Sequence, residues 1–195
     1  MLTIEGQHSE RLRFEAVDRS QYDQWLPFFK DPSTSVHWVE ARELPEIACA
    51  KWYDKQLWRY ANNRGGMNAL VEKASGKLVG YAGLLVQVVD GISELEIAYS
   101  LLPAFWNKGY ATEAARQCRD FAFTHRLAPS LISIISLTNL PSQKVARNNG
   151  MAIDKQTETI AIKFLSFVCK ARQQSNSAGC FQKVNLIGSK TNTNS

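Results

Sequence analysis

The stretch ELEIAYSLLPAFWNKGYATEA, residues 94–114, decides the fold. Its first half is rich in apolar residues and ends at Pro103, which has no N–H to donate, so we expect a strand that stops there. Its second half contains Gly109 and opens a helix predicted over 109–125. A glycine turn at a helix start leaves backbone N–H groups without partners, and together with the helix dipole they form an anion site.

Small and basic residues beside Gly109 favour a phosphate as the anion. Lys108 adds a positive charge, and Ala111 leaves room for a phosphate to approach the backbone. Thr112 can bond either a phosphate oxygen or the helix start. The alternative is an ordinary helix N-terminus with a loop glycine, because neither a P-loop GKS or GKT nor a dinucleotide GxGxxG is present.

Apolar periodicity and turn residues predict an α+β fold around this segment. The expected strands are 11–17, 68–72, 78–89, 93–102, 131–137, 152–158 and 160–169, and the expected helices are 20–30, 44–61, 109–125 and 141–149. Ser75-Gly76 and Asp90-Gly91 separate three of the strands as hairpin turns. An antiparallel meander that feeds a strand–helix–strand–helix unit predicts one domain of three layers.

Charge is concentrated in a C-terminal tail. The formal net charge of the 195 residues is +5, but residues 170–195 hold four basic residues and no acidic one, which leaves +1 for 1–169. A nucleic-acid-binding protein usually has a basic stripe on its folded body, so we expect no specific nucleic acid partner. The polar composition of 170–195 predicts a flexible appendage, unless its few apolar residues dock on the domain.

Cysteine placement and hydropathy exclude other classes of protein. Cys49, Cys118, Cys169 and Cys180 are far apart and form no CxxC, so we expect neither a disulfide framework nor a zinc or other metal site. No apolar run approaches the ~20 residues that span a bilayer, and the first ten residues do not resemble a signal peptide. These features predict a cytoplasmic protein with reduced thiols.

The central segment resembles the acetyl-CoA-binding core of the GNAT acetyltransferases. That family's motif is Gln/Arg-x-x-Gly-x-Gly/Ala, and this chain has Trp-Asn-Lys-Gly-Tyr-Ala at 106–111. Trp in the first position, followed by Gly-Tyr-Ala-Thr-Glu-Ala, is most similar to the ribosomal-protein N-acetyltransferase branch. That branch commonly has glycine where Asn107 stands, so one amide of the loop is presented differently here.

Two further matches follow the order of that branch. Asn-Leu-Pro-Ser at 139–142 and Asn-Gly-Met at 149–151 resemble its N-x-x-S…G-[FM] helix, and Arg-Leu-Arg-Phe at 11–14 resembles its first strand. The similarity spans roughly 3–169. It implies an acetyl-CoA-binding domain over 1–169, with a central mixed, mainly antiparallel sheet that is flanked by helices and splayed between strands four and five.

The resemblance also implies where acetyl-CoA binds as the acetyl donor. The pantetheine arm would pair with the backbone of the fourth strand at Ser100, Leu101 and Leu102, as an added pseudo-strand. Asn139 would face the pantetheine amides. The expected pyrophosphate-binding residues are Asn107, Lys108, Gly109, Tyr110, Ala111 and Thr112.

Two residues are candidates for the proton transfers of acetyl transfer to an amine. Glu96 lines up with the strand where some family members keep a glutamate base; its alternative is a solvated or salt-bridged strand residue, like Glu94 on the same face. Ser142 lies where the branch places a hydroxyl near the sulfur, as general acid or thiolate partner; its alternative is a helix cap. Other family members use a tyrosine in that helix, which has none here, and the amide near Leu101 would stabilise the tetrahedral oxyanion.

Other conspicuous residues are assigned to packing. His37 and Trp38 lie in a region that often lines the acceptor site, but we expect core packing rather than a pocket wall. Trp25, Trp52 and Trp58 occur at helical spacings and are also expected in the core.

Two functions remain. The first is an acetyl-CoA-dependent N-acetyltransferase that moves an acetyl group directly to a primary amine, either a protein N-terminus or a small molecule, without a covalent enzyme intermediate. The second, which Asn107 and the unusual tail keep open, is a catalytically inactive CoA-binding or interaction protein on the same fold. The sequence decides neither the acceptor nor whether the chain forms a homodimer.

Overall fold

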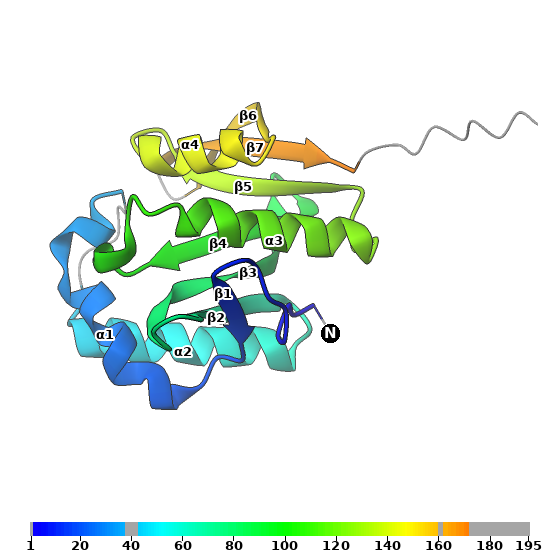
Figure 1. Ribbon diagram of the computed structural model, residues 1–195. Helices are drawn as coiled ribbons and strands as arrows, with labels where there is room; N and C mark the ends of the chain where they lie inside the picture. Colours follow the sequence, from blue (N-terminus) through cyan, green and yellow to red (C-terminus); the bar gives the residue numbers. More distant parts are fainter. Residues whose placement is uncertain (1, 38–42, 160–161, 172–195) are drawn as a thin grey trace, which may run out of the picture.

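Strands and helices follow one another in the predicted order (Figure 1). The computed structural model describes residues 2–37, 43–159 and 162–171, so the prediction of a flexible tail falls almost entirely outside the described residues. The strands are β1 (Leu12–Glu15), β2 (Gly65–Glu72), β3 (Leu78–Val89), β4 (Ile92–Leu101), β5 (Ser130–Ser136), β6 (Ala152–Thr159) and β7 (Ile162–Lys170). The helices are α1 (Tyr22–Lys30), α2 (Pro45–Ala61), α3 (Tyr110–Thr124) and α4 (Leu140–Asn148), with short 3-10 turns η1 (Arg19–Gln21), η2 (Pro32–Ser35) and η3 (Pro103–Phe105).

In the described part of the chain the strands form one sheet in the order β1-β2-β3-β4-β5-β7-β6. Neighbouring strands are antiparallel except β4 and β5, which are parallel. Between β3 and β4, Asp90 and Gly91 have φ of 50° and 80°, the positive values that a type I′ hairpin turn requires. The prediction of an α+β fold with a mixed, mainly antiparallel sheet is confirmed.

The helices cover both faces of the sheet and complete three layers (Figure 1). On one face, Trp25 of α1 and Tyr53 of α2 are fully buried against Tyr81 of β3. On the other face lie α3 and α4. Most residues that α3 buries are small and recur at helical spacing, so the helix can lie close to the strands. These residues are Tyr110, Ala114, Ala115, Cys118 and Ala122.

The prediction of a core position for Trp58 is wrong. Its side chain is 57% exposed, because α2 turns a different stripe toward the sheet. That stripe consists of Cys49, Tyr53, Gln56 and Arg59. Half of it is polar, which is why apolar spacing alone did not reveal the buried face of this helix.

Gly83 permits a close approach of β3 to β2. A Cβ at this position would lie 2.1 Å from the carbonyl oxygen of Gly66, a backbone atom held by the ladder. We expect Gly83→Ala to lower the free energy of unfolding by about 2–3 kcal/mol, measured by urea denaturation. Gly76→Ala is the control: nothing lies within 4 Å of its Cβ position, so only the strain of its φ of +69° remains, about 1 kcal/mol. Equal losses for the two variants would contradict this explanation.

Candidate active site

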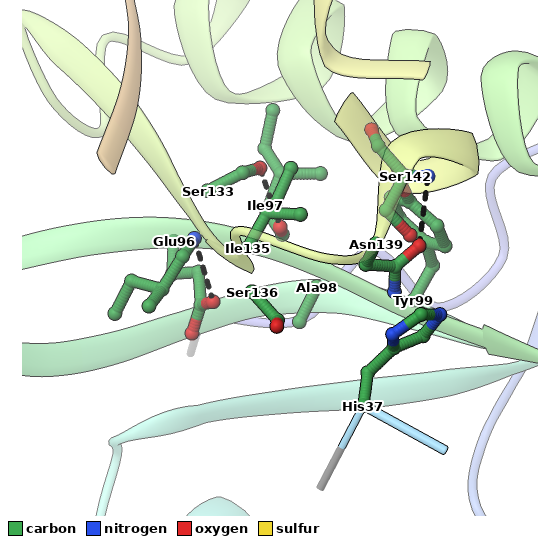
Figure 2. Close-up of a pocket in the computed structure, with 11 residues that line it drawn as sticks. His37, Glu96, Ile97, Ala98, Tyr99, Ser133, Ile135, Ser136, Asn139 and Ser142 are labelled. Atoms are coloured by element: carbon green, nitrogen blue, oxygen red, sulfur yellow. Dashed lines mark hydrogen bonds between the residues drawn. The ribbon is translucent and has the colours of Figure 1, made fainter. Parts of the chain in front are cut away.

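A cavity opens in the sheet where β4 and β5 separate. β3 pairs with β4 from Gly80 to Val89, whereas β4 and β5 pair only at Glu96 and Ile132. The cavity beyond this pair has a volume of about 190 Å³ (Figure 2). Its wall contains Glu96 and Tyr99 from β4, Ser133 and Ser136 from β5, and Asn139 and Ser142 from the start of α4.

Two side chains replace strand–strand hydrogen bonds at the opening. In a continued parallel ladder, the N–H of Ile134 would donate to the carbonyl of Ile97. Instead, Ile134 N–H donates to Glu96 Oε1 at 3.4 Å, and Ser133 Oγ donates to Ile97 O at 2.9 Å. The strands therefore separate without leaving these backbone groups unpaired, and Glu96 is held at the point where they part.

Glu96 and Tyr99 reach the opening from opposite faces of the sheet. Successive side chains of a strand point to opposite faces. Ile97 and Tyr99 belong to the core under α3 and α4, whereas Ala98 packs against the core under α1 and α2. Glu96 thus lies on the face of α1 and α2, and Tyr99 and Ser142 lie on the other. A group held between them would meet a carboxyl group on one side and hydroxyl groups on the other.

Glu96 is a buried carboxyl group, with 8% of the residue exposed. Burial raises its pKa and outweighs the hydrogen bonds from Gln87 Nε2 at 2.7 Å and from Ile134 N–H, as well as the positive charges of Arg59 and Lys55. Glu96 forms no salt bridge with any residue in the described ranges, so it is neither the solvated nor the salt-bridged strand residue of the alternative. A raised pKa makes its carboxylate a stronger base than an ordinary surface glutamate.

The start of α4 forms the hydroxyl side of the cavity. Asn139 Oδ1 accepts a hydrogen bond from Ser142 N–H at 3.1 Å, so Asn139 is the helix N-cap and Ser142 is not. Tyr99 lies against Ser142: its hydroxyl donates to the Ser142 carbonyl at 3.3 Å, and burial raises the pKa of Tyr99 to about 12. Tyr99 belongs to β4 and not to the helix of Ser142, so the resemblance, which places a tyrosine in that helix, did not indicate it. Figure 2 shows Ser142 on one side of Asn139 and His37 on the other.

His37 lines the cavity, so the prediction that it packs in the core is wrong. Its Nδ1 lies 2.9 Å from Thr138 Oγ1, which lies 3.1 Å from Ser136 Oγ at the end of β5. The chain after η2 thus meets the end of β5, a long-range contact that local sequence does not reveal. Trp38 lies outside the described residues.

The start of α3 presents an exposed turn at Asn107, Lys108 and Gly109. Asn107 and Gly109 have positive φ of 58° and 82°, and Gly109 is the N-cap of α3 with no side-chain cap. The first N–H groups of the helix are therefore left for another acceptor. Asparagine tolerates the left-handed region, so Asn107 keeps the turn where the family commonly has glycine. Tyr110 turns its ring into the core and offers only its amide, beside those of the next residues, Ala111 and Thr112.

Arg11, which the sequence placed only at the first strand, lies beside this turn. Its guanidinium donates to Glu113 Oε2 at 2.7 Å and to the Lys108 carbonyl at 3.0 Å, and it lies 4.2 Å from the centre of the Tyr110 ring. Burial raises the pKa of Glu113, but hydrogen bonds from Arg11 and Ser9 outweigh burial and lower it. Arg11 therefore joins the start of β1 to α3 and places a second cation next to Lys108.

At the end of β4, the backbone N–H and C=O groups of successive residues alternate between facing β3 and facing the opening. Leu102 N–H donates to Val79 O at 3.0 Å, so Leu102 and Ser100 direct their backbone groups toward β3. The backbone of Leu101 points the other way, where its carbonyl accepts a hydrogen bond from Trp106 Nε1 at 2.8 Å. Of these three predicted residues, Leu101 is the one whose N–H faces the side of the opening.

Within the described ranges, neither a metal site nor an activated thiol is formed. No group of three or more His, Cys, Asp or Glu side chains there could hold a metal ion. Cys49, Cys118 and Cys169 are buried free thiols, and burial raises the pKa of Cys49 to about 11 and that of Cys118 as well, which makes both poor nucleophiles. None of the described helices is long and apolar enough to cross a bilayer.

Comparisons with known proteins agree with this architecture. "Uncharacterized protein YkkB" of Bacillus subtilis (strain 168) is 27% identical over 151 residues, which cover 75% of this chain and 85% of that protein. The acetyltransferase from Agrobacterium tumefaciens str. C58 has the same fold, with a TM-score of 0.71, 22% identity, and coverage of 87% of this chain and 94% of that one. RimL, a ribosomal L7/L12 alpha-N-protein acetyltransferase in complex with coenzyme A, gives a TM-score of 0.68 at 11% identity and covers 86% and 97%. The model of the acetyltransferase (GNAT) domain family matches residues 11–152, and this chain therefore belongs to the GNAT acetyltransferase family.

Proposed function

We propose that the protein is an acetyl-CoA-dependent N-acetyltransferase that moves an acetyl group directly to a primary amine. The observation that carries this proposal is the arrangement across the opening between β4 and β5. The Glu96 carboxyl group lies on one face of the sheet, and Ser142 and Tyr99 lie on the other. Direct transfer needs a base on the side of the amine and a proton donor on the side of the departing thiolate.

Each residue then has one role. Glu96 accepts a proton from the ammonium group of the acceptor, either directly or through a water molecule. Leu101 N–H stabilises the negative charge that develops on the acetyl oxygen. The Ser142 hydroxyl protonates or stabilises the thiolate, and Tyr99, which contacts Ser142, holds that residue in place.

The start of α3 fits the phosphates of acetyl-CoA. The uncapped first turn after Gly109 offers N–H groups, and a Cβ at Gly109 would meet, among the described atoms, only Arg11 Nη2 at 3.4 Å, so a ligand can approach the backbone. We assign the pyrophosphate to the amides of 107–112, with Lys108 and Arg11 as cations. The amide nitrogen of Asn139, for which the described residues offer no hydrogen-bond partner, is assigned to the pantetheine arm. Coenzyme A is bound in RimL, which has the same fold.

The same proposal covers the organisation of the chain. Residues 1–169 form the acetyl-CoA-binding domain, and 170–195 form a basic appendage that catalysis does not require. The buried free thiols fit a reducing compartment such as the cytoplasm. The acceptor is either a protein N-terminus or a small amine, and a nucleic acid is not expected as a partner.

A panel of peptides with free N-termini and of small amines tests the function. We expect release of free CoA thiol from acetyl-CoA to increase with at least one acceptor and to saturate with both substrates. Mass spectrometry should find the acceptor heavier by one acetyl group. Tight binding of acetyl-CoA without thiol release across the panel would instead favour the inactive CoA-binding protein.

A further inference from the structure

A line of polar side chains, buried at Arg59 and Glu96 and half-buried at Gln87, connects α2 to the cavity wall. Arg59 of α2 is 7% exposed. Its Nη1 donates to the carbonyls of Arg64 at 3.2 Å and Val86 at 3.3 Å, and its Nη2 donates to Gln87 Oε1 at 3.3 Å. Gln87 Nε2 in turn donates to Glu96 Oε2 at 2.7 Å. The guanidinium therefore reaches the carboxyl group through one amide side chain.

The donor and acceptor groups determine how the Gln87 amide is oriented between Arg59 and Glu96. A guanidinium can only donate, so the Gln87 atom that faces Arg59 must be the amide oxygen. The amide nitrogen is then forced toward Glu96, where it can only donate. A carboxylate accepts such a bond better than a protonated carboxyl group does, so the line favours the ionised form of Glu96.

Arg59 satisfies two backbone carbonyls, but within the described ranges it lacks the ion pair that usually accompanies a buried cation. Among the described residues, none accepts a hydrogen bond from its Nε and no acidic side chain forms a salt bridge with it. Burial lowers the pKa of Arg59, which reflects the cost of a charge taken out of water. Beyond these two carbonyls, the buried cation acts on Gln87 and, through Gln87, on Glu96.

We propose that Arg59 and Gln87 are positioning residues for Glu96: Arg59 orients the Gln87 amide, whose N–H holds Glu96 as a carboxylate on the cavity wall. The role of Glu96 as the base rests on the proposed function, but the contact does not. The other charged or titratable groups around Glu96 are Lys55 on α2, Glu94 and Tyr99 on β4, and His37 on the cavity wall. Among the described residues, β5 adds none.

The pKa of Glu96 itself tests the proposal without any acceptor. We would titrate the ligand-free protein labelled with ¹³C at the glutamate carboxyl carbons and follow the chemical shifts by NMR. The signal absent from Glu96→Gln assigns Glu96. In Gln87→Met, which removes the donor at similar length, we expect the midpoint of Glu96 to rise by about one pH unit. Arg59→Lys keeps the charge but not the fixed fork, so a smaller rise is expected.

Lys55→Met is the matched control. Lys55 is an exposed cation one turn before Arg59 on the same helix, and its removal leaves Gln87 unchanged. Because solvent and salt screen an exposed charge, the midpoint of Glu96 should move by at most about 0.3 pH unit. Should Gln87→Met fail to fold, Gln87→Asn, which keeps an amide but is too short to span the gap, decides the matter. A midpoint unchanged in a folded Gln87 variant would overturn the proposal. If Glu96→Gln loses activity but the Glu96 midpoint does not shift in the Gln87 variants, only the positioning role is overturned. If the midpoint shifts in the Gln87 variants but Glu96→Gln keeps the wild-type kinetics, only the role of Glu96 as the base is refuted.

Discussion

Glu96→Gln should lower kcat at neutral pH by roughly 10²- to 10³-fold with an accepted amine, while the affinity for acetyl-CoA stays close to that of the wild type. The amide keeps the size and can still accept one of the two hydrogen bonds, from Gln87 Nε2 or from Ile134 N–H, but it cannot take a proton. In the wild type, the rate should fall as the pH drops through the pKa of Glu96, because the protonated carboxyl group is no longer a base. Burial raises that pKa, so this acidic limb should lie above the ordinary range of a glutamate. The acidic limb that reports Glu96 should be absent from Glu96→Gln. The rate of this variant should instead rise at the higher pH at which the acceptor amine is already deprotonated in solution.

Glu94→Gln is the control for this experiment. Glu94 lies two residues away on the same face of β4 but does not line the cavity. Its variant should keep kcat within about twofold of the wild type and should keep the acidic limb. An unaltered rate and limb in Glu96→Gln would show that water or another group takes the proton.

Gly109→Val should reduce the affinity for acetyl-CoA by roughly 100-fold or more, equivalent to about 2.8 kcal/mol. Two effects add. Gly109 has a φ of +82°, which a β-branched residue adopts only with strain, and the new side chain would cover the uncapped amides of α3. Calorimetry with acetyl-CoA measures the loss.

Gly76→Val is the control that distinguishes the effect of backbone strain from the effect of covering the ligand site. Gly76 has a similar φ of +69° in the turn between β2 and β3, and nothing lies within 4 Å of its Cβ position. This variant should be less stable but should bind acetyl-CoA normally. Normal binding by a folded Gly109→Val would mean that the phosphates lie elsewhere.

Much of the fold could be predicted because its signals are local. The strand β3 was predicted with its observed bounds, since a nearly continuous apolar run is closed on either side by Ser75-Gly76 and Asp90-Gly91. The turn before α3 was likewise predicted from Gly109, because a positive φ at a helix start is a property of a few consecutive residues. These features depend on neighbours in the chain.

The residues of the site are brought together by contacts between segments that are distant in the sequence, and such contacts could not be predicted from local patterns. Glu94 and Glu96 share a strand face, and only the point where β5 leaves β4 places Glu96 in the cavity. Arg11 meets Glu113 across 102 residues, and the role of Arg59 appears only where α2 packs beside β3. In a sequence, a polar residue that is buried cannot be distinguished from one on the surface, because its burial depends on hydrogen-bond partners from other segments.

A crystal structure of the protein with CoA tests the central claim most directly, because it locates the thiol. We predict that the sulfur lies in the opening between β4 and β5, between Glu96 on one side and Ser142 on the other, with the pyrophosphate on the amides that follow Gly109. A thiol outside this opening, or phosphates bound away from the start of α3, would contradict the assignment of this cavity as the site of acetyl transfer.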